Sequence, residues 1–115
     1  MIDQSRIDEL AEDFGRDDLG ELISTFLTEC DGVVETLQGL SDGSDLQARS
    51  DQFHLLKGCA RTVGAVGLGD LCETFEESPA TFSEDDLLHL RSEVQNVRGF
   101  FDAMFCDLST GAPRP

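Results

Sequence analysis

The amino-acid sequence predicts an all-α fold, namely an antiparallel up-down four-helix bundle with a short additional N-terminal helix. Three observations favour this fold class. Apolar residues recur every three or four positions along most of the chain, as they do on the buried face of a helix. No segment shows the strict apolar–polar alternation of a half-buried strand. The connections between the helical segments are short, which makes neighbouring helices antiparallel.

The first two helices follow from this spacing. A weak apolar pattern predicts the short N-terminal helix, which ends at Gly15. The first long helix is predicted between Leu19 and Leu37, with Asp18 and Glu21 as its N-terminal capping pair. Its apolar residues keep an unbroken helical spacing: Leu19, Leu22, Ile23, Phe26, Leu27, Cys30, Val33, Val34 and Leu37.

The second long helix carries the segment of greatest interest. Ser44 and Gln47 match a capping box at its start, and Gly64 is predicted to form the sharp turn at its end. Its apolar stripe consists of Leu46, Phe53, Leu56, Ala60 and Val63.

Two further helices complete the bundle. The third is shorter and closes at Ser78 and Pro79, and Ser83 caps the fourth. The chain has 115 residues, which is the size of one domain. We expect the helical bundle to occupy residues 1–108 and a flexible C-terminal tail to occupy residues 109–115.

The chain is strongly acidic, with 24 acidic residues against 8 lysines and arginines and a formal net charge of −16. Phosphate backbones and anionic lipid surfaces select for basic residues, so nucleic acid and membranes are poor partners. No apolar run reaches the ~18 residues of a membrane span, and the N-terminal residues do not resemble a signal peptide. We therefore expect a cytoplasmic protein.

The four cysteines, Cys30, Cys59, Cys72 and Cys106, are widely spaced and include no C-x-x-C pair. Three of them lie among apolar residues at helical spacing, where cysteine is usually a small buried side chain. Two disulfides in a secreted protein are the alternative, but reduced thiols in a cytosol are favoured. Neither the cysteines nor the two histidines have the spacing of metal ligands, so we expect no metal site.

One segment departs from a plain bundle, because the chain has no Asp or Glu from Gln52 to Gly69. This segment contains His54, Arg61 and Lys57, the only lysine of the chain. At about 100° per residue, these three side chains share the polar face of the helix. Such a positive patch on an acidic protein would attract an anion, and a neutral imidazole can attack phosphorus near neutral pH.

Gly58 lies one turn from the histidine, inside a helix, where glycine costs about 1 kcal/mol relative to alanine. The missing side chain would let the backbone of another molecule come close. We therefore predict that Ser50, Gly58 and Arg61 contribute to partner docking on this face. Arg49 falls on the apolar side and does not fit this face, unless its stem packs and its head reaches solvent.

A longer motif in this segment resembles a known family. His54-Leu55-Leu56-Lys57-Gly58, followed by Val63-Gly64-Ala65 and Leu68, resembles the H-x-x-K-G…G-x-x-x-L signature of histidine phosphotransfer (HPt) domains, and the similarity continues through Leu71, Cys72 and Phe75-Glu76. The resemblance implies that His54 carries a phosphoryl group and that Lys57 stabilises it. It also implies that Gly58 leaves room for the partner's active-site loop and that Gly64 is the turn glycine.

The resemblance further implies reversible phosphoryl transfer between His54 and an aspartyl phosphate on a receiver domain. The expected partners are response-regulator receiver domains and an upstream histidine kinase, and the expected state is a monomer. The chain would be a carrier and not an enzyme, since the family does not hydrolyse ATP and the sequence has no Gly-rich phosphate loop. It would need no cofactor of its own, because Mg²⁺ would belong to the receiver.

Two other functions fit the same residues. The substrate domain of a chemotaxis-type histidine kinase bears a similar H-x-x-K-G motif, with catalytic and dimerisation domains downstream. An adaptor could bind a receiver domain without accepting a phosphoryl group.

Overall fold

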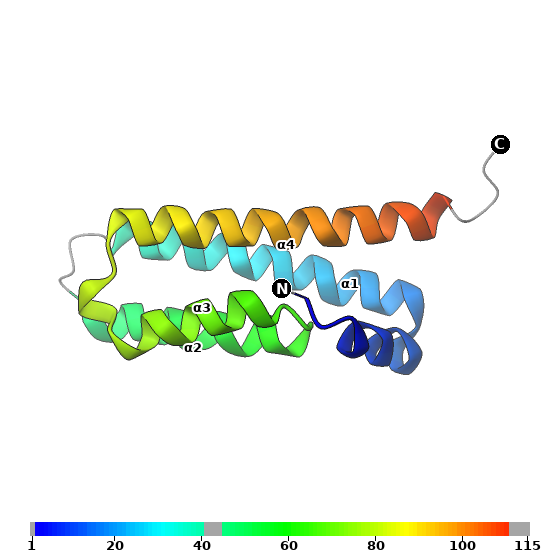
Figure 1. Cartoon of the computed structure of the whole chain (residues 1–115), viewed down its shortest axis with the longest axis horizontal. Helices are drawn as coiled ribbons and strands as arrows, with labels where there is room; N and C mark the ends of the chain where they lie inside the picture. The colour runs from blue at the N-terminus through cyan, green and yellow to red at the C-terminus, as the bar shows by residue number, and fades with distance from the viewer. Residues whose placement is uncertain (1, 41–44, 111–115) are drawn as a thin grey trace.

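The computed structural model describes residues 2–40 and 45–110. This part consists of the helices α1 (Gln4–Gly39), α2 (Leu46–Thr62), α3 (Val66–Glu77) and α4 (Glu84–Thr110), with a short 3-10 helix η1 (Pro79–Thr81) before α4 (Figure 1). No strand occurs among the described residues, so the all-α prediction is confirmed. None of these helices combines the length and apolar character that a bilayer crossing requires.

Each α-helix packs against two others around one core: α2 and α4 both contact α1 and α3. Figure 1 shows α2 and α3 side by side, and α1 and α4 extending beyond them at one end of the molecule. The apolar stripe of α2 points inward, since Phe53, Leu56 and Ala60 are fully buried. Phe53 contacts the rings of Phe75 and Phe82 at centroid distances of 5.5 and 4.9 Å. This packing fixes the rotation of α2 and therefore decides which of its side chains face solvent.

Helix α1 begins earlier than predicted and includes the segment that was assigned to a separate N-terminal helix. Its helical geometry is interrupted at Gly15, which has φ 80° and ψ 167° and kinks the helix. The N-cap is Asp3, whose carboxylate accepts a hydrogen bond from the backbone N–H of Arg6 at 3.3 Å. Asp18 lies inside the helix, so the prediction that it forms a cap is wrong. Glycine tolerates the left-handed φ that this kink requires.

The N-terminal end of α1 is attached to the turn between α2 and α3. The Asp3 N–H donates to the carbonyl oxygen of Gly64 at 2.7 Å, and Arg6 Nε donates to that of Thr62 at 3.0 Å. Gly64 has φ 81°, and a Cβ at this position would lie 2.9 Å from the Asp3 carbonyl oxygen. Both the backbone conformation and the approach of Asp3 therefore require glycine here.

The start of α2 differs from the prediction by one residue. Its N-cap is Asp45, whose carboxylate accepts a hydrogen bond from the backbone N–H of Ala48 at 2.9 Å. The capping box predicted for Ser44 and Gln47 is therefore wrong, and Ser44 itself lies outside the described residues. A carboxylate is favoured at this position because the positive end of the helix dipole attracts its negative charge.

Helix α4 begins as predicted. The backbone N–H of Asp86 donates to Ser83 Oγ at 3.2 Å, and the Ser83 N–H donates to the Asp86 carboxylate at 3.0 Å. The helix continues through Ser109 and Thr110, which were assigned to the tail. The rest of that tail, residues 111–115, lies outside the described residues.

Candidate functional site

His54 projects from the outer face of α2. Its neighbours in sequence, Phe53 and Leu56, are buried in the core, and helical geometry turns His54 away from them. The imidazole side chain is 72% exposed. A molecule approaching from solvent therefore has direct access to the ring.

A carboxylate of α3 holds the His54 ring in place. Glu76 Oε2 lies 3.0 Å from His54 Nδ1, and Glu76 Oε1 accepts a hydrogen bond from Lys57 Nζ at 2.6 Å. The Lys57 side chain is only 19% exposed, so the pair is partly shielded from water. The hydrogen bond from Lys57, aided by the one from His54, lowers the pKa of Glu76. Glu76 is thus an ionised group that bridges the histidine and the lysine.

This bridge determines the tautomer of the imidazole. An ionised carboxylate can only accept hydrogen bonds, so His54 Nδ1 must be the donor and must carry a proton. In the neutral ring the other nitrogen, Nε2, then keeps its lone pair. The arrangement leaves a nucleophilic nitrogen on an exposed ring whose orientation is fixed from behind.

The role of Glu76 was not predicted from the sequence, where it appeared only as part of the family motif. A signal was present, because the acidic residues Asp70, Glu73 and Glu76 recur every third position. Residues at this spacing lie along one side of a helix. They follow the acid-free segment directly, and acidic groups on α3 complement the basic groups of α2.

Arg61 contacts α3 instead of His54. Its Nη2 donates to the carboxylates of Asp70 at 3.3 Å and Glu73 at 3.2 Å, and the hydrogen bond to Asp70 is the main cause of its raised pKa. The side chain crosses α3 at Gly69, where a Cβ would lie 2.9 Å from Arg61 Cγ. The prediction of a positive patch that needs an external anion is therefore wrong. Carboxylates of α3 already neutralise both Lys57 and Arg61.

Other predicted residues lie at different distances from this centre. Ser50 is half-buried one turn before His54 on α2. Gly58 is exposed one turn after it, and a Cβ added there would meet no atom within 4 Å. Gly64 lies in the turn after α2 and contacts the N-terminal segment. The fold brings the unpredicted Glu76 into direct contact with both His54 and Lys57.

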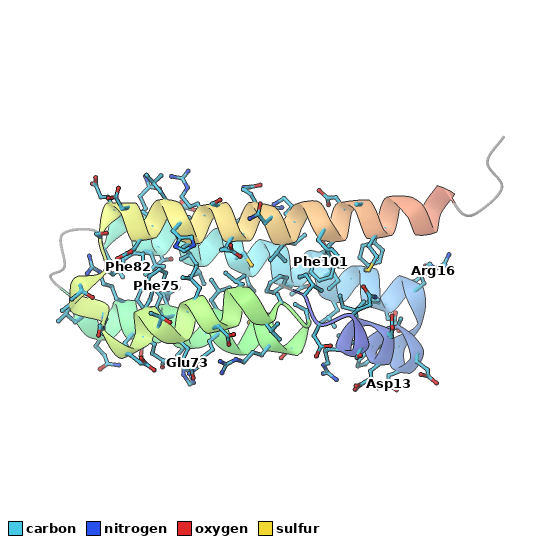
Figure 2. All side chains as sticks on the ribbon, viewed as in Figure 1. Asp13, Arg16, Glu73, Phe75, Phe82 and Phe101 are labelled. Carbon is cyan, nitrogen blue, oxygen red and sulfur yellow. The ribbon has the colours of Figure 1, made fainter. Side chains whose placement is uncertain are left out.

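Arg49 lies inside the protein. Its guanidinium head does not reach solvent, in contrast to the arrangement considered from the sequence. The residue is 3% exposed, and its Nη1 donates to the carbonyl oxygen of Pro79 at 3.0 Å. The guanidinium carbon lies 5.6 Å from the ring centre of Phe82. This cation–π contact and the hydrogen bond fix η1 against the start of α2. Figure 2 shows Phe75 and Phe82 close together in the interior, with Glu73 on the outer edge of the α2–α3 pair.

Cys30, Cys59 and Cys72 are free thiols. Burial, with a smaller contribution from Asp31, raises the pKa of Cys30 to about 12, and burial likewise raises that of Cys72 to about 12. Both thiols therefore stay protonated and unreactive at neutral pH. In the part of the chain that the structure describes, no group of three His, Cys, Asp or Glu residues is arranged to hold a metal ion.

Comparisons with known proteins identify a family and a relative. The family model of the Hpt domain matches residues 21–100. The phosphorelay protein LuxU of Vibrio harveyi is 33% identical to this chain over 73 residues, which are 64% of this chain and 61% of LuxU. The chain thus covers less than two thirds of that relative. No solved structure matches the chain.

Proposed function

The chain belongs to the Hpt domain family, and from this membership we propose that it carries a phosphoryl group on His54 in a two-component phosphorelay. The observation that carries the proposal is the exposed His54 ring with its Nδ1 held by Glu76. The description of LuxU as a phosphorelay protein supports the same function. The proposed donors and acceptors are receiver domains, with a histidine kinase upstream.

The chemistry proceeds by in-line transfer from a receiver aspartate. The lone pair of His54 Nε2 attacks phosphorus, the bond from phosphorus to the aspartate oxygen breaks, and its electron pair leaves on the aspartate carboxylate. Nδ1 keeps its proton, so the phosphorylated ring carries a positive charge. Glu76 faces this charge at 3.0 Å and stabilises it. The reverse step passes the group to a second receiver, and neither direction moves a proton.

Lys57 supplies a positive charge on the same carboxylate that bonds the His54 ring. Its Nζ donates to Glu76 and has further N–H donors available for phosphoryl oxygens. We propose that Lys57 shares its donors between Glu76 and the incoming group, and that Mg²⁺ on the receiver balances the remaining negative charge. The chain itself acts as a carrier without ATP hydrolysis.

We also infer the finer features of the fold and of its setting. An up-down order is supported by the colour gradient of Figure 1, in which α1 and α4 run in opposite directions and so do α2 and α3. The N-terminal part of α1 before Gly15 is the additional short helix of this order. A monomer in the cytoplasm is consistent with the free thiols and the high negative charge.

A transfer assay with matched proteins tests the proposal. The wild type and the His54→Gln variant are incubated with receiver domains carrying a radiolabelled aspartyl phosphate. We expect label on the wild type only, lost in acid and stable in alkali, as a phosphorylated imidazole is. Tight receiver binding by both proteins with no label on either would refute the carrier function and favour the adaptor.

A further inference from the structure

Three phenylalanine rings pack behind the contact between His54 and Glu76. On α2, Phe53 directly precedes His54. On α3, Phe75 directly precedes Glu76, and its ring centre lies 5.5 Å from that of Phe53. Phe82 completes this aromatic cluster, with its ring centre 4.9 Å from both of the others and beside Phe75 in Figure 2. The packing of the three rings therefore sets where α3 lies against α2 at the level of the site.

Arg49 is attached to the aromatic cluster from the first turn of α2. Its guanidinium carbon lies 5.6 Å from the ring centre of Phe82, and its Nη1 donates to the carbonyl oxygen of Pro79 at 3.0 Å. Pro79 begins η1, three residues after Glu76. One side chain of α2 thus holds both the ring that closes the cluster and the backbone that leaves the Glu76 end of α3.

Stability alone does not explain a buried arginine at this position. Arg49 is 3% exposed, and its Nε has no hydrogen-bond partner. Among the described residues, no carboxylate pairs with its guanidinium. A buried charge without an ionic partner and a buried donor without an acceptor both lower stability. Replacing buried charged groups by apolar side chains of similar size is often neutral or stabilising. The role of Arg49 is therefore sought in what it positions.

We propose that Arg49 is a positioning residue for the phosphoryl transfer, which holds the end of α3 where the Glu76 carboxylate meets His54 Nδ1. This inference rests on the proposed function and extends the site to a buried residue five positions before His54. Glu76 bonds His54 at 3.0 Å and Lys57 at 2.6 Å, so a displacement of about 1 Å would break one of the two bonds. Without that carboxylate, the neutral ring populates both tautomers and its Nε2 is less often free to attack.

Arg49→Met separates position from stability. Methionine is apolar and close to arginine in length, and Pro79 is only half-buried, so water can replace the lost donor. We expect the thermal midpoint to equal or exceed that of the wild type. The nitrogen chemical shifts of His54 will nevertheless change from the Nδ1–H tautomer to a mixture. Labelling by phosphoramidate, a small donor that needs no docking surface, will be slower by about tenfold.

Two further arginine variants serve as controls. Arg49→Lys keeps a donor for the Pro79 carbonyl oxygen, so its His54 shifts and labelling rate will lie closer to the wild type than those of Arg49→Met. Arg98→Met makes the same substitution on α4, where Arg98 bonds Asp31 of α1 at 2.6 Å. It removes an ion pair but will leave the His54 shifts and the labelling rate unchanged.

Loss of stability has a control of its own, in case Arg49→Met melts below the wild type. Gly64→Ala strains the opposite end of α2, where a Cβ would lie 2.9 Å from the Asp3 carbonyl oxygen. We expect this variant to melt lower and to keep the Nδ1–H tautomer of His54. A mixed tautomer in Gly64→Ala as well would show that any destabilisation loosens the ring, and would overturn the assignment to Arg49.

The decisive comparison repeats Arg49→Met in the Glu76→Gln background. A residue that acts through Glu76 has little left to disturb there, so Arg49→Met will slow phosphoramidate labelling of Glu76→Gln by less than about twofold. Equal slowing in both backgrounds, or wild-type His54 shifts in Arg49→Met, would overturn the positioning role and leave the carrier function intact. A wild type that neither phosphoramidate nor a phosphorylated receiver labels would overturn the carrier function and the positioning role with it.

Discussion

His54 and His89 present two different surroundings for the same side chain. Both histidines are exposed on α-helices and both lie beside α3, His54 on α2 and His89 at a groove that α4 forms with Asp70 and Thr74 of α3. Glu76 bonds the His54 ring and Lys57 flanks it. Within the described residues, no hydrogen bond or ion pair holds His89. Both imidazoles are accessible, and at His54 a fixed carboxylate decides which ring nitrogen keeps its lone pair.

The basic side chains of α2 are paired with acidic side chains of α3, but the pairs differ in their contact with the imidazole. Lys57 and Arg61 are both bonded to α3, yet only the Lys57 pair includes the imidazole. Arg61, two turns after His54 on α2, joins α2 to α3 through Asp70 and Glu73. The α2–α3 face therefore holds a preorganised group, whereas the α3–α4 groove holds a free side chain.

The largest expected effect separates the two histidines directly. Treated with phosphoramidate, the wild type will acquire one phosphoryl group, which mass spectrometry of peptides will locate on His54. His54→Gln will lose this modification, and His89→Gln will keep it at the wild-type rate. Comparable labelling of His89 in either protein would show that the carboxylate gives His54 no advantage and would break the comparison.

Replacement of Glu76 by glutamine tests the carboxylate itself. The amide keeps the size of the side chain but lacks the charge, and hydrogen bonds to charged groups contribute about 1.5–3 kcal/mol. We expect receiver transfer by Glu76→Gln to be slower by about tenfold to a hundredfold. Nitrogen chemical shifts will report the Nδ1–H tautomer of His54 in the wild type and a mixture in the variant.

Glu73→Gln is the control for this measurement, since it removes a carboxylate of α3 that contacts Arg61 and not His54. Its His54 nitrogen shifts will stay at the wild-type values. The shifts of His89 will be those of a mixed tautomer in all three proteins. A wild-type His54 that also shows mixed tautomers would mean that Glu76 does not fix the ring.

Gly64 joins the end of α2 to the N-terminal segment through its contact with Asp3. Gly64→Ala places a methyl group 2.9 Å from the Asp3 carbonyl oxygen and forces alanine into φ 81°. We expect a loss of about 2 kcal/mol in the free energy of unfolding, measured with urea. Gly99→Ala, at a relaxed and open position, will gain about 0.5–1 kcal/mol. A neutral Gly64→Ala would contradict the contact between the N-terminal segment and the turn.

The smallest effect is the pH dependence of the Glu76 contacts. Since folding lowers the pKa of Glu76, its contacts stabilise the fold above the ordinary carboxyl pKa and are lost as the pH falls through the lowered value. The wild type will be more stable than Glu76→Gln at neutral pH by less than about 1 kcal/mol, because the pair is near the surface. The two unfolding free energies will converge at acidic pH. A constant difference would assign the stabilisation to packing.

Periodicity was sufficient to predict the helices and the outward direction of His54. Both results depend on residues within one helix, whose geometry is regular. Glu76 could not be assigned in this way, because its contact with His54 joins residues 22 positions apart and depends on how α3 is placed against α2. The same holds for Arg49, whose burial depends on Phe82 and Pro79.

The sequence predicted the interactions of charged side chains less accurately than it predicted the helices. An acid-free segment was interpreted as a free positive patch, because charge along a sequence does not reveal charge across an interface between helices. Arg61 illustrates the point, since both of its carboxylate partners come from α3. Helix caps were predicted with mixed success. Ser83 caps α4 as predicted. At α2 the cap is Asp45 and not Ser44, because neighbouring polar residues compete for the same backbone N–H groups.

Hydrogen bonds from Asp3 and Arg6 attach the N-terminal segment to the end of α2 and the turn after it, so this segment is part of the folding unit. The shared family region begins at residue 21, yet Ile7 and Leu10 are buried and the segment around them contacts the helix that carries His54. A shortened chain that begins at residue 21 would lose these anchors and uncover apolar surface at the end of α2. Recombinant versions intended for kinetics should therefore retain the preceding residues, because homology alone marks too short a folding unit.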